Sequence, residues 1–117
     1  MHYDSNVPIY LQVMDSLKKK IISGEMLPGD KLPSTRILAV EYDINPNTAA
    51  RVYKELEMQG ICFTKRGEGT FVIESAGLID QLSEETATLI IRRFINEMSD
   101  LGFNKTQIIN KINEMEI

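Results

Sequence analysis

Residues 43–57 read DINPNTAARVYKELE, and this stretch decides the fold. Asn45 stands directly before Pro46, and apolar residues at helical spacing follow. Asparagine is a favourable N-cap because its side-chain oxygen accepts a backbone N–H, and proline suits the first helical position, where no N–H is needed. The sequence therefore predicts that Pro46 starts a helix, and that this helix points a polar first turn outward.

The predicted helix is amphipathic. Its apolar positions recur at the three- and four-residue spacing of one buried face. They are Ala49, Val52, Tyr53 and Leu56. The opposite face carries Asn47, Arg51 and Lys54, and Gly60 is the expected end of the helix. Such a helix would pack one side against its own domain and leave the other side free.

Two further helices are predicted before it. The first opens at Pro8, has Ile9, Val13, Leu17 and Ile21 at four-residue spacing, and ends at Gly24. The second runs from about Thr35 to Glu41, with Ser34 as its N-cap. Asp43 follows where a short turn requires a positive φ, which aspartate tolerates better than most residues. The last two helices of the three thus form a helix-turn-helix.

Residues 61–74 change to the two-residue period of a β-hairpin. Ile61 and Phe63 alternate with polar or small residues, and Phe71 lies on the other arm. The turn is expected at Gly67-Glu68-Gly69, with Lys65 and Arg66 giving the tip a positive charge. A hairpin with a basic tip behind two short helices is typical of a winged helix-turn-helix.

In this motif the second helix enters the major groove of DNA, and its first residues meet base edges. We therefore expect double-stranded DNA as the partner. The candidate DNA-binding residues are Ser34, Arg36, Asn45, Asn47, Thr48, Arg51, Lys54, Lys65, Arg66, Gly67 and Thr70.

Side-chain chemistry separates the roles of these residues. Asn47 has the amide geometry that suits adenine, Arg51 is expected to fork onto guanine, and Arg36 can reach a phosphate or a guanine edge. Gly67 allows the wing backbone to approach a minor groove, whose negative potential attracts Arg66. Phosphate contacts, which set register without reading sequence, are expected from Thr48, Lys54 and Lys65.

Several spaced segments resemble a known family. These are PIYLQV (8–13), ISGEMLPGDKLPSTRILA (22–39), INPNTAARVYKELEMQG (44–60) and KRGEGTFV (65–72). They resemble the GntR family of bacterial transcription regulators, and the Asn-Pro-Asn-Thr entrance with a short helical tail resembles its YtrA-like subfamily. The resemblance implies DNA contacts at Arg36, Asn47, Thr48, Lys65, Arg66 and Gly67. Most of the family has arginine where Pro46 stands and commonly another at Ala50, so the resemblance does not define the operator sequence.

Residues 75–117 are predicted to form a two-helix dimerisation domain behind a DNA-binding domain of residues 1–74. After a joint at residues 75–77, a helix from Leu78 to Leu101 would be about 36 Å long and apolar on more than one side. A short last helix, opened by Asn104 and Gln107 as a capping box, can cover only part of it. Exposed patches of this size usually mark an interface. The expected dimer residues are Leu89, Ile90, Phe94, Ile95, Met98, Leu101, Ile108 and Ile112.

A two-fold homodimer would place two recognition helices about one DNA turn apart, which predicts a pseudo-palindromic operator and, by analogy with the family, a repressor. Two tail helices hardly enclose the cavity of a typical ligand site. Any small-molecule effector would therefore have to bind between the two chains or act on the joint at residues 75–77.

The net charge of −4 over 117 residues is at first sight unfavourable for DNA binding. Most of the net negative charge lies in the C-terminal part of the sequence. Residues 1–74 hold nine Lys and Arg against ten Asp and Glu, whereas residues 75–117 hold four Lys and Arg against seven Asp and Glu. Phosphate binding depends on where cations lie, so the local surface decides. The alternative is a winged-helix module that binds an acidic protein through Arg36, Arg51 and Lys54.

Other classes are disfavoured by composition. No apolar run approaches the length of a membrane helix, and no signal peptide precedes the first helix, so we expect a cytoplasmic protein without a membrane partner. One histidine, His2, and one cysteine, Cys62, leave no metal site, disulfide or nucleophile–base pair. We therefore expect neither a cofactor nor an enzymatic activity.

Overall fold

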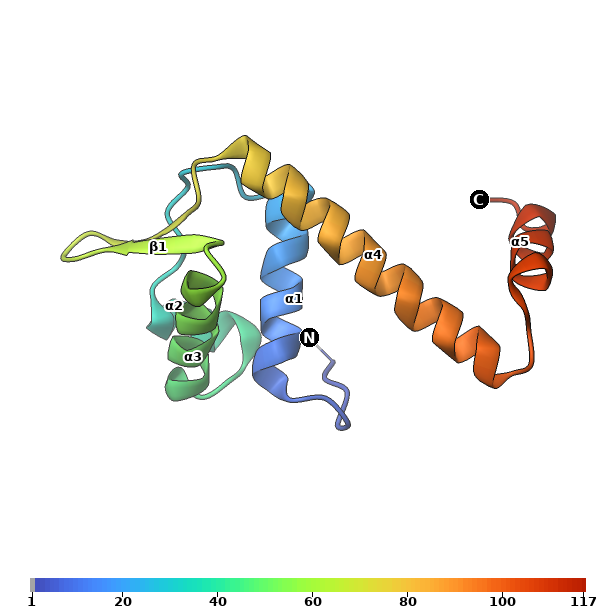
Figure 1. Ribbon diagram of the computed structural model, residues 1–117. Helices are drawn as coiled ribbons and strands as arrows, with labels where there is room; N and C mark the ends of the chain where they lie inside the picture. Colours follow the sequence, from blue (N-terminus) through green and yellow to red (C-terminus); the bar gives the residue numbers. More distant parts are fainter. Residues whose placement is uncertain (1) are drawn as a thin grey trace. The chain divides into compact units, whose positions relative to one another are not determined.

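The computed structural model describes residues 2–117, which form five α-helices and a two-stranded antiparallel sheet (Figure 1). In chain order the elements are α1 (Ile9–Ile22), α2 (Thr35–Tyr42), α3 (Pro46–Met58), β1 (Cys62–Lys65), β2 (Gly69–Val72), α4 (Ala76–Asp100) and α5 (Lys105–Glu114). The predicted fold class is confirmed: the chain is mainly helical with a small hairpin.

The chain divides into two compact units, one ending at Gln81 and the other extending from Leu82 to Ile117. This division falls within α4, and the predicted domain boundary between residues 74 and 75 remains a prediction. Within residues 2–117 no helix combines the length and the apolar character needed to cross a membrane.

The helix-turn-helix forms as its local residues predict. Ser34 caps α2, since its Oγ accepts the backbone N–H of Ile37 at 3.2 Å. Asp43 ends α2 with a φ of 51°, the left-handed conformation expected for the turn. Asn45 then caps α3, and Pro46 occupies the start of that helix. The proline is therefore a start signal, as predicted.

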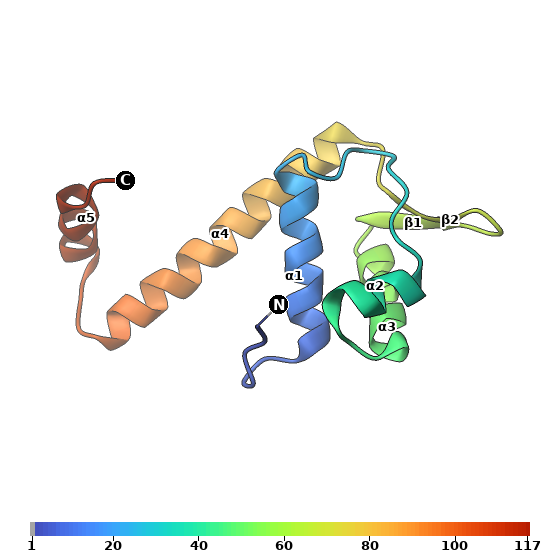
Figure 2. The same ribbon diagram turned by 180° about the vertical axis from the view of Figure 1, so that it is seen from behind.

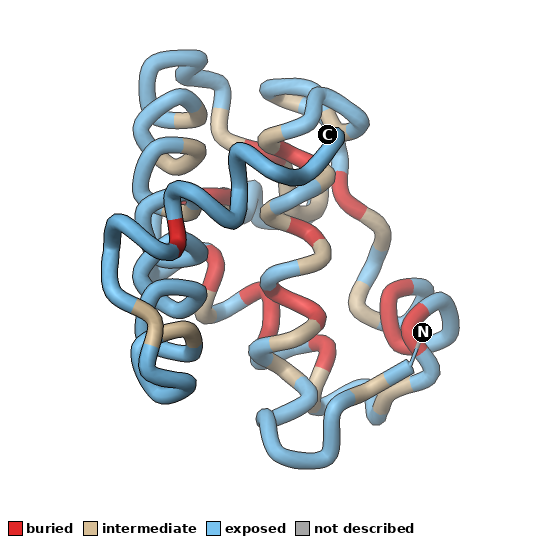
Figure 3. Tube along the Cα trace, turned by 90° about the vertical axis from the view of Figure 1, so that its right-hand side faces the viewer, coloured by how far each residue is buried: buried red, intermediate tan, exposed pale blue. Residues whose placement is uncertain are grey.

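The core of the first unit lies where α3 contacts α1 and α2 (Figures 1 and 2). Its buried positions recur along the three helices and are red in Figure 3. They include Val13, Met14, Leu17 and Ile21 of α1, Leu38, Ala39 and Tyr42 of α2, and Ala49, Val52, Tyr53 and Leu56 of α3. The predicted inward stripe of α3 is thus confirmed.

The first helix departs from its prediction at its start. Pro8 has ψ 135° and lies at the N-cap, so α1 begins one residue later than expected. Ile9, the first member of the predicted apolar stripe, is exposed, whereas Val13 and Leu17 are buried. The four-residue spacing therefore identified the buried face of α1 but not the point at which burial begins.

The hairpin pairs Cys62 with Val72 and Lys65 with Gly69. Its turn residues are 66–68, one position earlier than predicted, and Gly69 already belongs to β2. The segment before α2 adds a third, short pairing: Leu32 N–H donates to Thr70 O at 2.8 Å and Val72 N–H donates to Asp30 O at 2.8 Å. This segment fixes the wing to the entrance of α2.

The joint predicted at residues 75–77 is instead the start of a helix. Ala76 and Gly77 are the first residues of α4, and Ser75 Oγ accepts the backbone N–H of Leu78 at 3.3 Å. A serine at an N-cap stabilises a helix entrance, which is the physical reason that these small residues do not form a loop.

The second unit holds α5 and the larger part of α4. Asn104 and Gln107 form the predicted capping box. The backbone N–H of Gln107 donates to Asn104 Oδ1 at 2.9 Å, and the backbone N–H of Asn104 donates to Gln107 Oε1 at 2.8 Å. Ile108 is buried within its own chain, unlike most of the predicted dimer residues. Exposed large apolar side chains in this unit are Leu89, Ile90, Ile91, Phe94, Ile95, Leu101, Ile109, Ile112, Met115 and Ile117, and Met98 is half-buried.

Candidate nucleic-acid interface

The first turn of α3 presents polar groups to solvent. Asn45 and Asn47 are exposed and Thr48 is half-buried, while Ala49, the next residue, is fully buried. The cap bond from Asn47 N–H to Asn45 Oδ1 fixes the entrance of the helix. A helix N-terminus held this way offers amide donors and the positive end of the helix dipole to an approaching anion.

Arg51 leaves this helix in the direction of α1. Its guanidinium carbon lies 3.7 Å from the centre of the Tyr10 ring, while the side chain as a whole remains exposed. Tyr10, which was not among the predicted site residues, therefore borders the candidate surface. No local pattern indicates this contact, because the two residues are far apart in the sequence.

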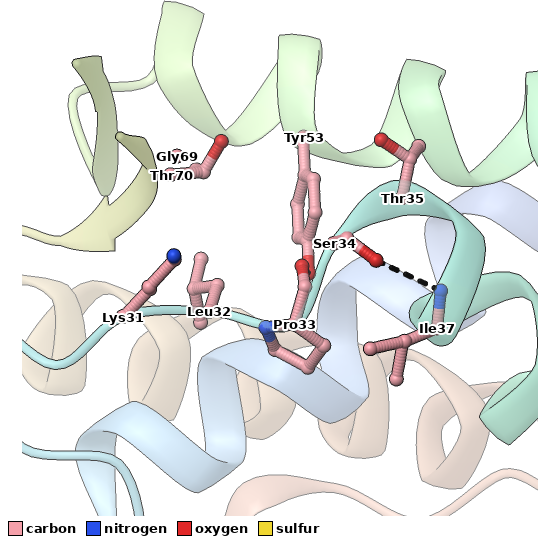
Figure 4. Close-up of a pocket in the computed structure, with 9 residues that line it drawn as sticks. All are labelled: Lys31, Leu32, Pro33, Ser34, Thr35, Ile37, Tyr53, Gly69 and Thr70. Carbon is pink, nitrogen blue, oxygen red and sulfur yellow. Dashed lines mark hydrogen bonds between the residues drawn. The ribbon is translucent and has the colours of Figure 1, made fainter. Parts of the chain in front are cut away.

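A cleft of about 620 Å³ joins the start of α2, the middle of α3 and the wing (Figure 4). It is lined by Lys31, Leu32, Pro33, Ser34, Thr35, Ile37, Tyr53, Gly69 and Thr70. The cleft brings together Ser34 and Thr70 of the predicted set and adds Lys31, which the sequence reasoning missed. None of these lining residues, all within the described part of the chain, is acidic, which suits an anionic partner.

Lys31 and Tyr53 shape this cleft from opposite sides. Figure 4 shows Lys31 reaching from the segment before α2 toward Gly69 and Thr70. Tyr53 projects from α3, and its hydroxyl donates to Pro33 O at 2.5 Å. Burial raises the pKa of Tyr53, and Cys62 adds to the effect, so the hydroxyl keeps its proton to a higher pH than an exposed tyrosine does.

In the wing, the Lys65 side chain lies over a pair of aromatic rings. Phe63 and Phe71 stack across the two strands with ring centres 5.7 Å apart, and Lys65 Nζ lies 5.7 Å and 5.1 Å from them. Arg66 and Gly67, at the turn, are exposed, and Gly67 has the φ of 80° that a glycine accommodates without strain. The predicted wing residues therefore form an accessible cationic tip.

The remaining predicted residues, Arg36 in α2 and Lys54 in α3, are both exposed. The candidate set is therefore accessible throughout, with half-buried Thr48 and Thr70 as its least exposed members. The geometry links Ser34 to Thr70 through the cleft and Asn45 to Asn47 through the cap, while Arg51 is linked to α1.

Residues 9–72 match the model of the bacterial regulatory proteins of the gntR family. The chain belongs to the GntR family. It is 40% identical over 110 residues to the uncharacterized HTH-type regulator YhcF of Bacillus subtilis, covering 94% of this chain and 91% of that protein. It is 44% identical over 93 residues to the repressor YtrA of the same organism, covering 74% and 72%.

Solved structures agree with this membership. A GntR family regulator from Listeria monocytogenes has a TM-score of 0.88 at 39% identity, covering 97% of this chain and all of that one. The DNA-binding domain of AraR in complex with an operator has a TM-score of 0.56 at 28% identity, covering 62% of this chain and 89% of that one. The predicted GntR resemblance and winged fold are confirmed, and the chain is a DNA-binding transcription regulator rather than an enzyme.

Proposed function

We propose that this GntR protein is a cytoplasmic repressor that binds a pseudo-palindromic operator as a homodimer. The observation that carries the proposal is the capped first turn of α3, which turns Asn47 to solvent while Ala49 and Val52 are fully buried. A helix anchored on one side and polar on the other is the form in which a helix-turn-helix presents base-reading residues to a major groove.

The names of two relatives support the proposal of a repressor that binds an operator. YtrA of Bacillus subtilis is a repressor, and the AraR domain was solved bound to an operator. From their side-chain chemistry, we assign base reading to Asn47 and Arg51, a phosphate or a guanine edge to Arg36, and phosphate contacts to Thr48, Lys54 and Lys65. The cleft lined by Ser34 and Thr70 has no acidic residue among the described residues of its lining, which suits a surface that contacts DNA phosphates.

The second unit supports the homodimer. Leu89, Phe94 and Ile95 are exposed together with several other large apolar residues of α4 and α5. Large apolar side chains exposed in such number are unfavourable in water and usually mark an interface. A two-fold axis is the simplest arrangement in which two identical surfaces cover each other.

The test is selection of bound fragments from a random duplex pool, followed by titration of the selected duplex with salt. We expect an inverted repeat to emerge. We also expect the affinity of the protein for it to fall steeply with salt, because the lysines and arginines of the protein release counterions from the DNA phosphates on binding, and added salt opposes that release. Recovery of a single half-site would contradict the dimer. Absence of duplex binding even at low salt would favour the alternative, a module that binds an acidic protein partner.

A further inference from the structure

The Arg51 side chain lies closer to an aromatic ring than the lysines that approach rings elsewhere in the described part of the chain. Its guanidinium carbon lies 3.7 Å from the centre of the Tyr10 ring, whereas the lysines over Tyr42, Phe63 and Phe71 lie between 5.1 Å and 5.7 Å from theirs. At that distance a guanidinium rests on the ring face, where both the quadrupole and dispersion attract it.

Tyr10 is a fixed support for this contact. It is the second residue of α1 and is half-buried, and Val13 and Met14, one turn later, lie in the core between the helices. Because α1 contacts α3 directly, the backbone that carries the Tyr10 ring is held beside the helix that carries Arg51. The longer arginine side chain is therefore the more mobile partner of the stack.

Stacking leaves the hydrogen-bonding groups of Arg51 available. Guanidinium N–H donors lie in the plane of the group and point outward from its edge, so a ring on one face does not block them. A free arginine side chain samples many rotamers, and fixing it on binding costs conformational entropy. A ring that holds the arginine beforehand reduces that loss and also limits the direction in which the fork points.

We propose that Tyr10 is a positioning residue for DNA reading: it holds the Arg51 fork toward a guanine edge in the major groove. The proposal rests on the proposed function and deepens it, because it assigns α1, which lies outside the helix-turn-helix pair, a part in sequence discrimination. Tyr10 acts here through Arg51 and not as a base contact of its own.

The experiment compares variants of the full chain on the selected operator and on a scrambled duplex by fluorescence anisotropy. Tyr10→Leu removes the aromatic face, and we expect it to weaken operator binding about three- to tenfold while leaving scrambled-duplex binding unchanged. Tyr10→Phe keeps the face and should restore operator binding. Lys20→Gln is the matched control, because it removes a cation and a cation–ring contact at the other end of α1, over Tyr42.

Two further variants test the coupling directly. Arg51→Lys keeps the charge and loses the planar fork, so it should lose operator selectivity as Tyr10→Leu does. In a double-mutant cycle, Tyr10→Leu should add no further loss once Arg51 is alanine. Arg51→Lys also keeps the test informative if Tyr10→Leu fails to fold, which thermal unfolding monitored by circular dichroism would show.

Three results would overturn the proposal: wild-type selectivity in a folded Tyr10→Leu variant or in Arg51→Lys, an equal loss on operator and scrambled duplex, or additive losses in the cycle. Failure of the proposed function gives a different result, since the wild-type chain would then show no salt-dependent binding to any duplex.

Discussion

The side-chain Oδ1 of Asn45 accepts a hydrogen bond of 2.8 Å from the backbone N–H of Asn47, the residue that the proposed function places against a base. One asparagine therefore orients the turn that carries the other. Pro46, between them, supplies the helical φ without needing a hydrogen bond of its own. The stability of this entrance and the placement of Asn47 are coupled through a single bond.

Asn45→Ala should lower the free energy of unfolding by about 1 kcal/mol, because it removes this cap. Asn45→Asp and Asn45→Ser retain an oxygen at the same place and should cost less. Urea unfolding measures the difference. A loss as large in Asn45→Ser as in Asn45→Ala would show that the cap does not account for the effect.

Gly69→Ala should destabilise the wing by about 1 to 3 kcal/mol, since Gly69 has a φ of 123° that residues with a Cβ avoid. An added Cβ would also lie 2.8 Å from a carbon near the end of the Lys31 side chain, but that chain is flexible and can move. Thermal unfolding is the measurement, and Lys31→Ala should restore little of the loss.

Gly77→Ala is the control for this change. Gly77 lies in the first turn of α4, does not have a positive φ, and its nearest neighbour to an added Cβ is Ser75 Oγ at 3.8 Å. We expect this substitution to be neutral or slightly stabilising because alanine favours helix more than glycine does. Equal losses from both substitutions would contradict the role of φ.

Stability should fall as pH rises from 9 to 11. Burial, with a smaller effect of Glu57, raises the pKa of the Cys62 thiol from 9.0 to about 11, so over this range the folded chain keeps a proton that the unfolded chain loses. Unfolding is then favoured by deprotonation. Chemical unfolding at a series of pH values should show a shallower decline for Cys62→Ala than for the wild type. Slopes are compared because the substitution also changes packing.

Ile90→Glu should convert the proposed dimer to monomers, because it places a charge among exposed apolar side chains that a second copy would have to bury. Sedimentation velocity measures the change, and operator affinity should fall with it. Val40→Glu is the control: Val40 is 78% exposed in α2, outside the second unit, and its replacement should leave the oligomeric state unchanged. A dimer that survives Ile90→Glu at micromolar concentration would place the interface elsewhere.

Arg51→Ala and Lys54→Ala should separate base reading from phosphate binding. Removing Arg51 should cost about 1 to 3 kcal/mol on the operator and relax preference at one base position in each half-site. Removing Lys54 should weaken all sequences alike and reduce the salt slope by about 1. Binding to a panel of single-base variants of the operator gives both quantities, and equal profiles from the two variants would contradict the division of roles.

Features set by neighbouring residues could be predicted from the sequence. Ser34, Asp43 and Asn45 each act within three residues along the chain, and each adopts the conformation that its chemistry favours. The same is true of the capping box at Asn104 and Gln107. Where a local preference has two outcomes the prediction was wrong, as at Ser75, whose small neighbours Ala76 and Gly77 suit a loop as well as a helix start.

Features that join distant segments could not be predicted. The contact of Tyr10 with Arg51, and the pairing of Lys31 with Phe71, depend on how complete helices and strands pack. A cation on a helix surface has the same sequence signature whether it is solvated or stacked on a ring from another helix. The candidate site was therefore predicted as a set of accessible residues, while its internal organisation required the structure.

The pairing of residues 30–32 with β2 bears on how DNA preference can be exchanged between relatives. Backbone groups pair whatever side chains they carry, so a hairpin grafted from another regulator keeps these bonds only if its second strand has the length and register of Gly69–Val72. A graft that shifts this strand by one residue would leave the N–H of Leu32 and the carbonyl of Asp30 without their native partners.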